Sequence, residues 1–358
     1  MFQEALKNDY ISGSTAIVVL WMNGQILVGN LGDSKALLCS RRTHFDQDSE
    51  APFSFLTILE ELTRDHHHDR DDEKSRSFEA LAKDEGIENR ESWASVNFTD
   101  VFESSWAPDH IAVVGDQVTL SLDNSSGCGF ESKIKYLFGK ASAQIKLVDG
   151  DSAGTVIAFY MSSEGANHDE LDFEFLGNVS GEPYLVQTNV YVNGIGDREQ
   201  RHSLWFDPTT DFHTYSFFWN HHTIIFSVDE IPIRVFQNKE KKGVAYPKNQ
   251  GMGIYGSLWN ADDWATQGGR VKTNWSHSPF VTTFRSFEID ACDLSGEDIA
   301  AAGAKCGKLA HFLWDKPAMK GLKKSKKRQF KMVQSKYLVY DYCKDTARFT
   351  QMPKECSH

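Results

Sequence analysis

The stretch 167-NHDELDFEFLGN-178 sets acidic and apolar side chains in strict alternation. Side chains at every second position share one face of a β-strand, so this stretch predicts a strand with one apolar and one acidic face. The apolar face is suited to burial against a second layer. Packing does not explain the acidic face, because neighbouring like charges repel. That face holds Glu170, Asp172 and Glu174.

Short alternating segments of the same kind recur from about Ala94 onward, separated by Gly, Asn and Asp. Examples are QVTLSLD (117–123), YLVQTNVYV (184–192) and FHTYSFFWN (212–220). Closely spaced strands of this type are typical of antiparallel sandwiches and barrels. After Ala291 a Lys-rich, helix-prone stretch precedes a last expected strand in SKYLVYDYC (335–343). The chain is therefore predicted to be all-β, an antiparallel β-sandwich with a C-terminal extension.

The first part of the chain has a different character. STAIVVLW and QILVGNL read as two strands joined by MNG, where Asn-Gly is a hairpin signal. Highly charged residues with few aromatics follow, as in a linker, and a histidine run inside them (66–68) is typical of solvated side chains, so no metal is predicted. The expected domains are an incomplete hairpin fragment (1–45), a charged and poorly ordered linker (46–93), the sandwich (94–290) and the extension (291–358).

Bulk composition narrows the functional classes. The chain has 358 residues, 40% of them hydrophobic and 12% aromatic, and a formal net charge of −12. Such a charge repels phosphate, so nucleic acid is not an expected partner, whereas a neutral polymer is not repelled. No apolar run approaches the ~20 residues that span a membrane. No basic segment followed by an apolar run stands at the start, so no signal peptide is apparent.

The cysteines are unevenly distributed. Cys292, Cys306, Cys343 and Cys356 lie in the last quarter of the chain, without the C-x-x-C spacing of a zinc site. Four cysteines allow three pairings, of which the sequential one (292–306 and 343–356) closes two short loops. Disulfides imply an oxidising compartment. Four free thiols are the alternative.

The acidic strand face can perform glycosidic chemistry. Over four residues of a strand, at ~3.3 Å each, the Cα atoms of Glu170 and Glu174 lie about 13 Å apart, and their long side chains can lean together. Retaining glycosidases need two carboxyl groups about 5–5.5 Å apart. Clustered carboxylates also raise at least one pKa. A calcium site or a merely solvated face are alternatives, but the indoles of FFWN (217–220) and SLWNADDWATQGG (257–269) favour a sugar ligand.

HDELDFEFLGN together with SLWNADDWATQGGRVKTNW and the terminal YDYCKDTARFTQMPKEC resembles the xyloglucan endotransglucosylase/hydrolase family of plant cell walls. The resemblance extends from about residue 95 to 358. It implies a jelly roll whose concave sheet binds a β-1,4-glucan backbone with xylose branches. It also implies transfer of the cut chain to another xyloglucan end, no cofactor, a monomer, and secretion to the apoplast. An endo-hydrolase or a non-catalytic glycan-binding sandwich are the alternatives.

The resemblance also assigns roles to residues. Glu170 matches the nucleophile, Glu174 the general acid/base, and Asp172 the residue that steadies the nucleophile. Asn178 matches an N-glycan site, and Cys128 stands where a small residue other than cysteine is expected, which suggests a buried free thiol. The positions that match substrate-binding residues are His168, Gln187, Thr188, Asn189, Asp197, Arg198, Glu199, Asp263, Trp264, Gly268 and Arg348.

The front piece has a resemblance of its own. SGSTAIVVL followed by GQILVGNLGDSKALLCS is similar to a strand pair of the type 2C protein phosphatases, with Asp33 at a motif aspartate. No D-G-H motif occurs in the chain. A dinuclear metal site needs several carboxylates from distant strands, so the fragment predicts no phosphatase activity.

Overall fold

The computed structural model describes residues 95–295, 306, 314 and 319–357, together with the backbone of four strands nearer the N-terminus. The chain divides into two units, Met1–Lys74 and Ser75–His358. The predicted linker (46–93) lies outside the described residues except for one strand at 55–61, and both the histidine run at 66–68 and Asp33 are also outside them.

The first unit contains two antiparallel hairpins. In one, β1 (Ala16–Met22) pairs with β2 (Gln25–Leu31), and Met22 lies opposite Gln25, as the Asn-Gly signal predicts. In the other, β3 (Leu37–Thr43) pairs with β4 (Phe55–Glu61). The second hairpin was not expected, because its strands fall across the predicted boundary between fragment and linker.

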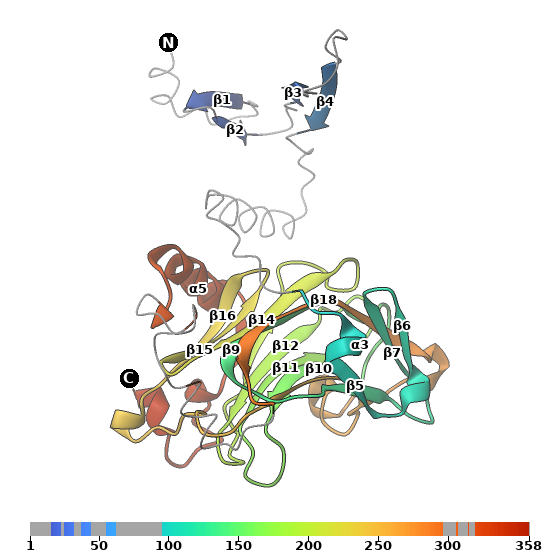
Figure 1. Cartoon of the computed structure of the whole chain (residues 1–358), viewed down its shortest axis with the longest axis vertical. Helices are drawn as coiled ribbons and strands as arrows, with labels where there is room; N and C mark the ends of the chain where they lie inside the picture. Colours follow the sequence, from blue (N-terminus) through green and yellow to red (C-terminus); the bar gives the residue numbers. More distant parts are fainter. Residues whose placement is uncertain are drawn as a thin grey trace. The chain divides into compact units, whose positions relative to one another are not determined.

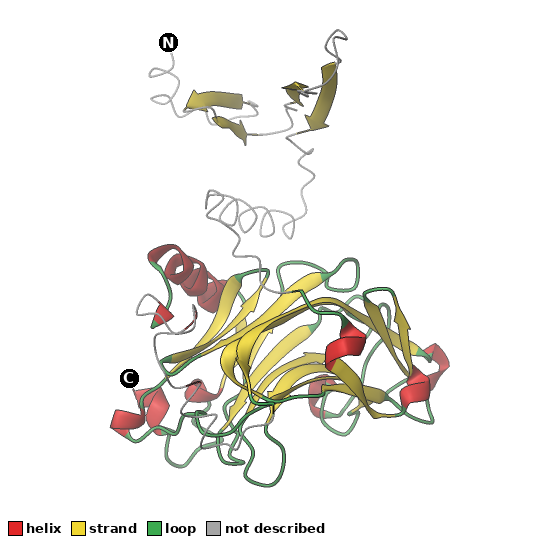
Figure 2. Ribbon diagram, in the orientation of Figure 1, coloured by secondary structure: helices red, strands yellow, loops and turns green. Residues whose placement is uncertain are grey.

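The second unit is the predicted β-sandwich (Figures 1 and 2). One sheet has eight strands in the order β19-β13-β12-β11-β10-β17-β8-β5, and the other has seven in the order β16-β15-β14-β9-β18-β7-β6. Every paired neighbour runs antiparallel. The eight-stranded sheet contains β5 (Phe102–Trp106), β8 (Cys128–Ser132), β10 (Thr155–Ser162), β11 (Glu170–Leu176), β12 (Leu185–Tyr191), β13 (Gln200–Ser203), β17 (Gly253–Asn260) and β19 (Leu338–Asp341).

The opposing sheet and the few helices complete the unit. The seven-stranded sheet contains β6 (Ile111–Val114), β7 (Gln117–Leu122), β9 (Tyr136–Lys146), β14 (His213–Trp219), β15 (Thr223–Val228), β16 (Ile231–Gln237) and β18 (Phe280–Asp293). Among the described residues, the α-helices include α3 (Phe98–Val101) and α5 (Lys324–Lys336), and the 3-10 turns include η1 (Pro108–His110), η2 (Glu240–Lys242), η3 (Thr266–Gly268), η4 (Trp275–His277), η7 (Tyr342–Lys344) and η8 (Lys354–Ser357).

Aromatic side chains form the core between the two sheets. The ring of Phe173 on β11 lies 4.9 Å from Phe217 on β14 and 5.4 Å from Phe226 on β15, and all three side chains are fully buried. Burying each such ring contributes about 1.5–3 kcal/mol. Because Phe173 faces the core, its neighbours in the alternation point to the outer face of the eight-stranded sheet.

The C-terminal extension returns to the sandwich at both sheets. Its helix α5 packs on the edge strand β16, with Gln329 and Val333 buried four residues apart, one helical turn. Its strand β19 pairs with β13 and ends the eight-stranded sheet. The predicted Lys-rich helix and the predicted last strand are therefore both present.

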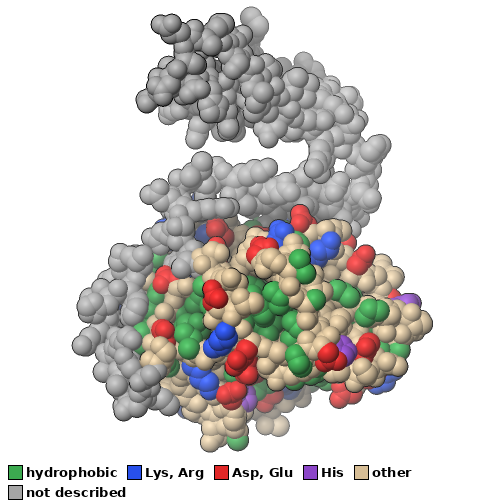
Figure 3. All heavy atoms as spheres, turned by 45° about the vertical axis from the view of Figure 1, so that its right-hand side comes forward, with side chains coloured by type: hydrophobic (Ala, Val, Ile, Leu, Met, Phe, Trp, Pro, Cys, Tyr) green, Lys and Arg blue, Asp and Glu red, His purple; other side chains and the backbone are tan. Residues whose placement is uncertain are grey.

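On the face of the sandwich drawn in Figure 3, acidic and basic side chains are interspersed around a central group of hydrophobic ones. Within the residues that the structure describes, no helix is long and apolar enough to cross a membrane.

Candidate active site

Strand β11 presents the three carboxylates on the outer face of the eight-stranded sheet. Leu171, Phe173 and Phe175 on its other face are fully buried in the core. Glu170 keeps 21% of its side chain exposed, whereas Asp172 is buried at 6%. The alternation in the sequence thus becomes a row of acids in which a buried aspartate lies between two partly exposed glutamates.

Asp172 is the most deeply buried acid of the row. Burial raises its pKa well above the ordinary aspartate value, and the charges of Glu170 and Glu174 raise it further. A hydrogen bond joins its side chain to that of Glu170. Asp172 therefore keeps a proton to higher pH than an ordinary aspartate, and it can donate this proton in its hydrogen bond with the Glu170 carboxyl group.

Burial also raises the pKa of Glu174. Gln187, directly opposite on β12, opposes that rise, because its Nε2 donates a 2.6 Å hydrogen bond to Glu174 Oε2. The charge of Glu170 adds to the rise and the charge of Arg201 counters it. Glu174 therefore keeps its proton to higher pH than an ordinary glutamate, and the Gln187 amide can donate a hydrogen bond to its ionised form.

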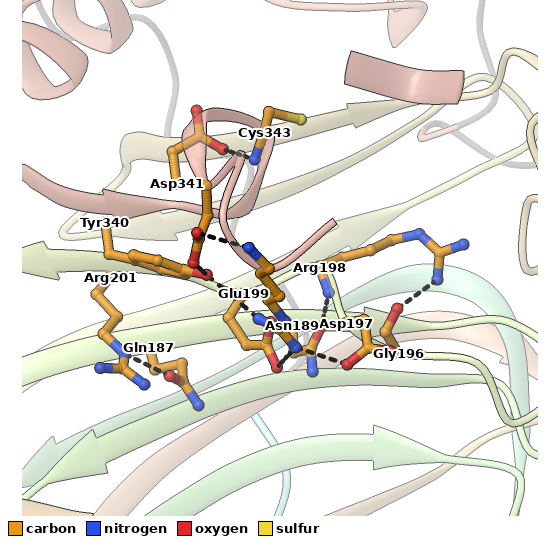
Figure 4. A network of polar contacts seen from close by, with 12 residues as sticks. Gln187, Asn189, Gly196, Asp197, Arg198, Glu199, Arg201, Tyr340, Asp341 and Cys343 are labelled. Carbon is orange, nitrogen blue, oxygen red and sulfur yellow. Dashed lines mark hydrogen bonds and ion pairs between the residues drawn. The ribbon is translucent and has the colours of Figure 1, made fainter. Parts of the chain in front are cut away.

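Arg201 on β13 fixes the orientation of the Gln187 side chain. Arg201 Nε donates a 2.7 Å hydrogen bond to Gln187 Oε1, as Figure 4 shows. A guanidinium has only donors, so the amide oxygen must face Arg201 and the amide nitrogen must face Glu174. The ring of Tyr340 on β19 lies 5.4 Å from the Arg201 guanidinium carbon. Neither Arg201 nor Tyr340 was singled out from the sequence.

His168 lies beside Glu170 at the open end of the row. Its Nδ1 is 2.8 Å from the carbonyl oxygen of Gly165, and its Nε2 is 3.8 Å from Glu170 Oε2. Its ring also packs against Tyr191, with 5.0 Å between ring centroids. The structure thus places His168 next to the expected nucleophile.

On one side of the carboxylates the sheet floor is made of small residues. The strand registers set Ala158 opposite Glu174, Ser257 opposite Ala158, and Gly129 opposite Ser257. The indole of Trp106 covers Gly129 so closely that a Cβ there would lie 2.5 Å from Trp106 Nε1. We call this strip of small side chains the trough; it ends at Trp106, which is 41% exposed.

One wall of this trough is aromatic. Tyr160 and Tyr255 lie in the row of Asp172 on β10 and β17, and their rings stack 4.8 Å apart. Burial and nearby acids raise the pKa of both phenols, so both keep their protons at neutral pH. Flat rings beside a floor of small side chains suit a sugar chain. None of these residues was singled out from the sequence.

On the other side of the carboxylates, Arg348 of the C-terminal extension reaches the loop before β13. Its Nη2 is 2.6 Å from Asp197 Oδ1, and its Nη1 is 2.6 Å from Glu199 Oε2. Asn189 lies opposite Asp172 on β12, and its Oδ1 accepts a hydrogen bond from the backbone nitrogen of Arg198. The structure therefore brings the Asp197, Glu199 and Arg348 positions together.

Two residues expected to bind substrate have buried side chains. Thr188 lies between Gln187 and Asn189 on β12 and so faces the core, where it is fully buried and its hydroxyl accepts from Arg234. Arg198 is 9% exposed and donates to the carbonyls of Val190 and Gly196 and to Glu355 Oε1. Both side chains make contacts inside the protein, and substrate binding by these two residues stays a prediction.

The remaining expected positions lie in surface loops. The ring of Trp264, in the loop after β17, lies 6.2 Å from that of Trp259, and Asp263 and Gly268 are exposed in the same loop. Asn178 follows β11, is partly exposed, and its Nδ2 lies 3.1 Å from the carbonyl oxygen of Pro183.

Both disulfides expected from the sequential pairing are formed, Cys292–Cys306 and Cys343–Cys356. Cys128 is buried and unpaired, as suggested. Among the described residues, no group of three or more His, Cys, Asp or Glu side chains could hold a metal ion.

Comparison with known proteins places this geometry in context. Residues 98–277 match the glycosyl hydrolases family 16, residues 310–356 the xyloglucan endo-transglycosylase (XET) C-terminus, and residues 1–81 protein phosphatase 2C. Xyloglucan endotransglucosylase protein 6 of Diospyros kaki is 57% identical over 270 residues, covering 75% of this chain and 90% of that protein. Xyloglucan endotransglucosylase/hydrolase protein 9 of Arabidopsis thaliana is 55% identical over 269 residues, covering 75% and 91%.

Solved structures show weaker similarity. The apo Crh5 transglycosylase is 25% identical with a TM-score of 0.46, covering 56% of this chain and 84% of that one. The Bacillus licheniformis beta-glucanase is 24% identical with a TM-score of 0.43, covering 56% and 94%.

Proposed function

Since the chain belongs to the xyloglucan endotransglucosylase/hydrolase family of the glycosyl hydrolases of family 16, we propose that Glu170 and Glu174 cut a xyloglucan backbone and rejoin it to another xyloglucan end. The chain is thus a retaining glycosyl-transferring enzyme. The observation that carries the assignment of roles is the acid row of β11, in which Glu170 lies beside the proton-holding Asp172 and the raised pKa of Glu174 suits it to give up a proton.

In the first step Glu170 attacks the anomeric carbon while Glu174 gives its proton to the leaving oxygen. The products are a glycosyl-enzyme ester on Glu170 and a departing glucan end. Asp172 donates its hydrogen bond to Glu170 and so holds that carboxylate in line for attack. The elevated pKa of Glu174 provides the proton near neutral pH.

In the second step Glu174, now ionised, removes the proton from an incoming hydroxyl, which displaces Glu170 and restores both acids. A glucan hydroxyl gives transfer, and water gives hydrolysis. The Gln187 amide stabilises the ionised Glu174 at this stage through its 2.6 Å hydrogen bond. The choice between acceptors depends on whether a bound glucan outcompetes water.

The two sides of the carboxylate row suit different parts of the substrate. We assign the trough of Ala158, Ser257 and Gly129, ending at Trp106, to the donor chain, because small floor residues and aromatic edges admit sugar rings. We assign the side near Arg348 to the acceptor, which would then lie partly against the C-terminal extension.

The enzyme's surroundings follow from the same family. Members are cell-wall enzymes, and the two disulfides support an oxidising, extracellular site for this chain, the apoplast. Neutral xyloglucan serves as donor and acceptor without a cofactor. We propose that the enzyme acts as a monomer, since both glutamates and both sides of the cleft come from one chain.

Incubation with xyloglucan and a labelled xyloglucan oligosaccharide tests the proposal. Transfer puts label into polymer, whereas an endo-hydrolase shortens the polymer and leaves the label in the oligosaccharide. Glu170→Ala should abolish both outcomes. Unchanged polymer turnover in Glu170→Ala would mean that the acid row is not the catalytic machinery, and binding without turnover in the wild type would indicate a glycan-binding sandwich.

A further inference from the structure

One segment of this acidic chain is strongly basic. Residues 319–336 contain eight basic and no acidic residues, whereas the whole chain has a net charge of −12. Most of the segment forms α5. The basic residues are Lys320, Lys323, Lys324, Lys326, Lys327, Arg328, Lys331 and Lys336.

Four of these cations form a stripe along the outer side of α5. Lys324, Lys327, Arg328 and Lys331 are all exposed, and they recur at the three- and four-residue spacing that keeps side chains on one helical face. Val333 marks the opposite, buried face, which packs on β16. Seven residues at ~1.5 Å each make this cationic stripe about 10 Å long.

The charge pattern opposes the helix's own stability. The first turn of α5 has no acidic residue, although the positive end of the helix dipole favours one. Lys324 and Arg328 stand four apart, as do Lys327 and Lys331, and like-charge pairs at this spacing are unfavourable. A solvated face usually mixes both signs, as the face in Figure 3 does. Folding of α5 therefore gives no reason for the stripe, whereas a bound polyanion would relieve its repulsion.

A pocket opens next to the stripe. It has a volume of about 410 Å³, and its lining includes Lys327 and Phe330 of α5, Gln237 at the end of β16, and Lys239 just beyond it. The lining also includes the carboxylate of Glu355, which is paired with Arg198. Ligand pockets span roughly 300–1,000 Å³, so this one admits a sugar-sized group. Two ammonium groups, an amide and an aromatic ring suit a sugar ring that bears a carboxylate.

We propose that the cationic stripe and its pocket bind an acidic polysaccharide, a polymer of uronic acids, at a place separate from the acid row of β11. The bound polymer anchors the enzyme while the cleft acts on neutral glucan. An acidic polysaccharide is favoured over a membrane or a nucleic acid because family members are cell-wall enzymes, which work among polysaccharides, and because the pocket accepts a single ring.

The test is binding of the full chain to polygalacturonate at low salt, with its fully methyl-esterified form as the neutral comparison. Wild type should bind the acidic polymer only, and more weakly as salt rises past about 0.1 M, where the screening length is about 10 Å. Arg328→Glu/Lys331→Glu should weaken binding at least about 20-fold, since each cation near an anionic surface contributes a roughly five-fold factor.

The matched control is Lys133→Glu/Lys241→Glu, which changes the net charge equally at two exposed lysines outside the stripe. It should leave binding unchanged. Transfer between xyloglucan chains, measured without acidic polymer, should be the same in all three proteins, so a failure here is distinct from a failure of the proposed function. If both double variants lost the same affinity for polygalacturonate, net charge alone would explain the binding, and the assignment to the cationic stripe would be wrong. Tighter binding to anionic phosphatidylserine vesicles or to duplex DNA than to polygalacturonate would overturn the assignment to polysaccharide.

Discussion

Replacing Gln187 by methionine should move the basic limb of the pH profile to higher pH. Glu174 must carry its proton to release the leaving group, so kcat/KM falls as pH rises through the pKa of Glu174. The Gln187 amide donates a 2.6 Å hydrogen bond to Glu174 Oε2 and therefore favours the ionised form of Glu174. Methionine has a similar length and no donor. Without the hydrogen bond the pKa of Glu174 rises further above its ordinary value.

The size of the shift follows from the contact. A hydrogen bond to a charged group is worth about 1.5–3 kcal/mol, and one pKa unit corresponds to 1.36 kcal/mol, so the ceiling is about 1–2 units. Arg201 keeps its charge near Glu174 and continues to lower that pKa, so we expect a shift of about one unit.

The assay is kcat/KM for transfer to a labelled acceptor across the pH range in wild type, Gln187→Met and Gln200→Met. Gln200 is a matched control on the neighbouring strand, where its Nε2 donates to Asp341 rather than to the acid row. Gln200→Met should leave the basic limb of the pH profile at the same pH as in wild type. A basic limb that stays fixed in Gln187→Met, or moves to lower pH, would refute the idea that this amide tunes the acid/base.

Three further outcomes are expected. Phe173→Ala should lower the free energy of unfolding by about 3–5 kcal/mol in denaturant titrations, because it leaves a cavity at a fully buried position between the sheets. The control Val114→Ala, at a 77% exposed edge position, should change that free energy little. Equal effects of the two substitutions would contradict the core assignment. Cys343→Ser/Cys356→Ser should lose about 3 kcal/mol, the entropy of a loop with sequence separation 13, and a melting temperature equal to that of wild type would contradict it. Trp106→Ala should raise KM for long xyloglucan donors without moving either limb of the pH profile, and an unchanged KM would remove Trp106 from the donor trough.

The period-two pattern was enough to predict the sandwich and the direction of the acid row. The same pattern predicts that the Thr188 side chain faces the core, since Gln187 and Asn189 cannot share a face with the residue between them. The burial of Arg198 could not be predicted in this way. Its partner Glu355 lies far along the chain, and nothing local in the sequence indicates that a guanidinium will be buried there.

Other features depended on strand register, which the sequence does not reveal. Ala158, Ser257 and Gly129 are unremarkable separately, and they form a trough only because three antiparallel pairings align them with Glu174. Arg201 likewise acts through its neighbour on the next strand. The β3–β4 hairpin was missed because its charged and polar residues outweighed the short apolar run in β4.

The pairing of β19 with β13 has a consequence for how the enzyme is made. Both glutamates leave the ribosome well before Tyr340, Arg348 and Glu355, which close the sheet edge, meet Asp197 and Glu199, and hold Arg198. Under the proposed roles, a nascent chain therefore contains the residues that cut before the surface that receives a second glucan. Rejoining then depends on residues that are translated after those that cut.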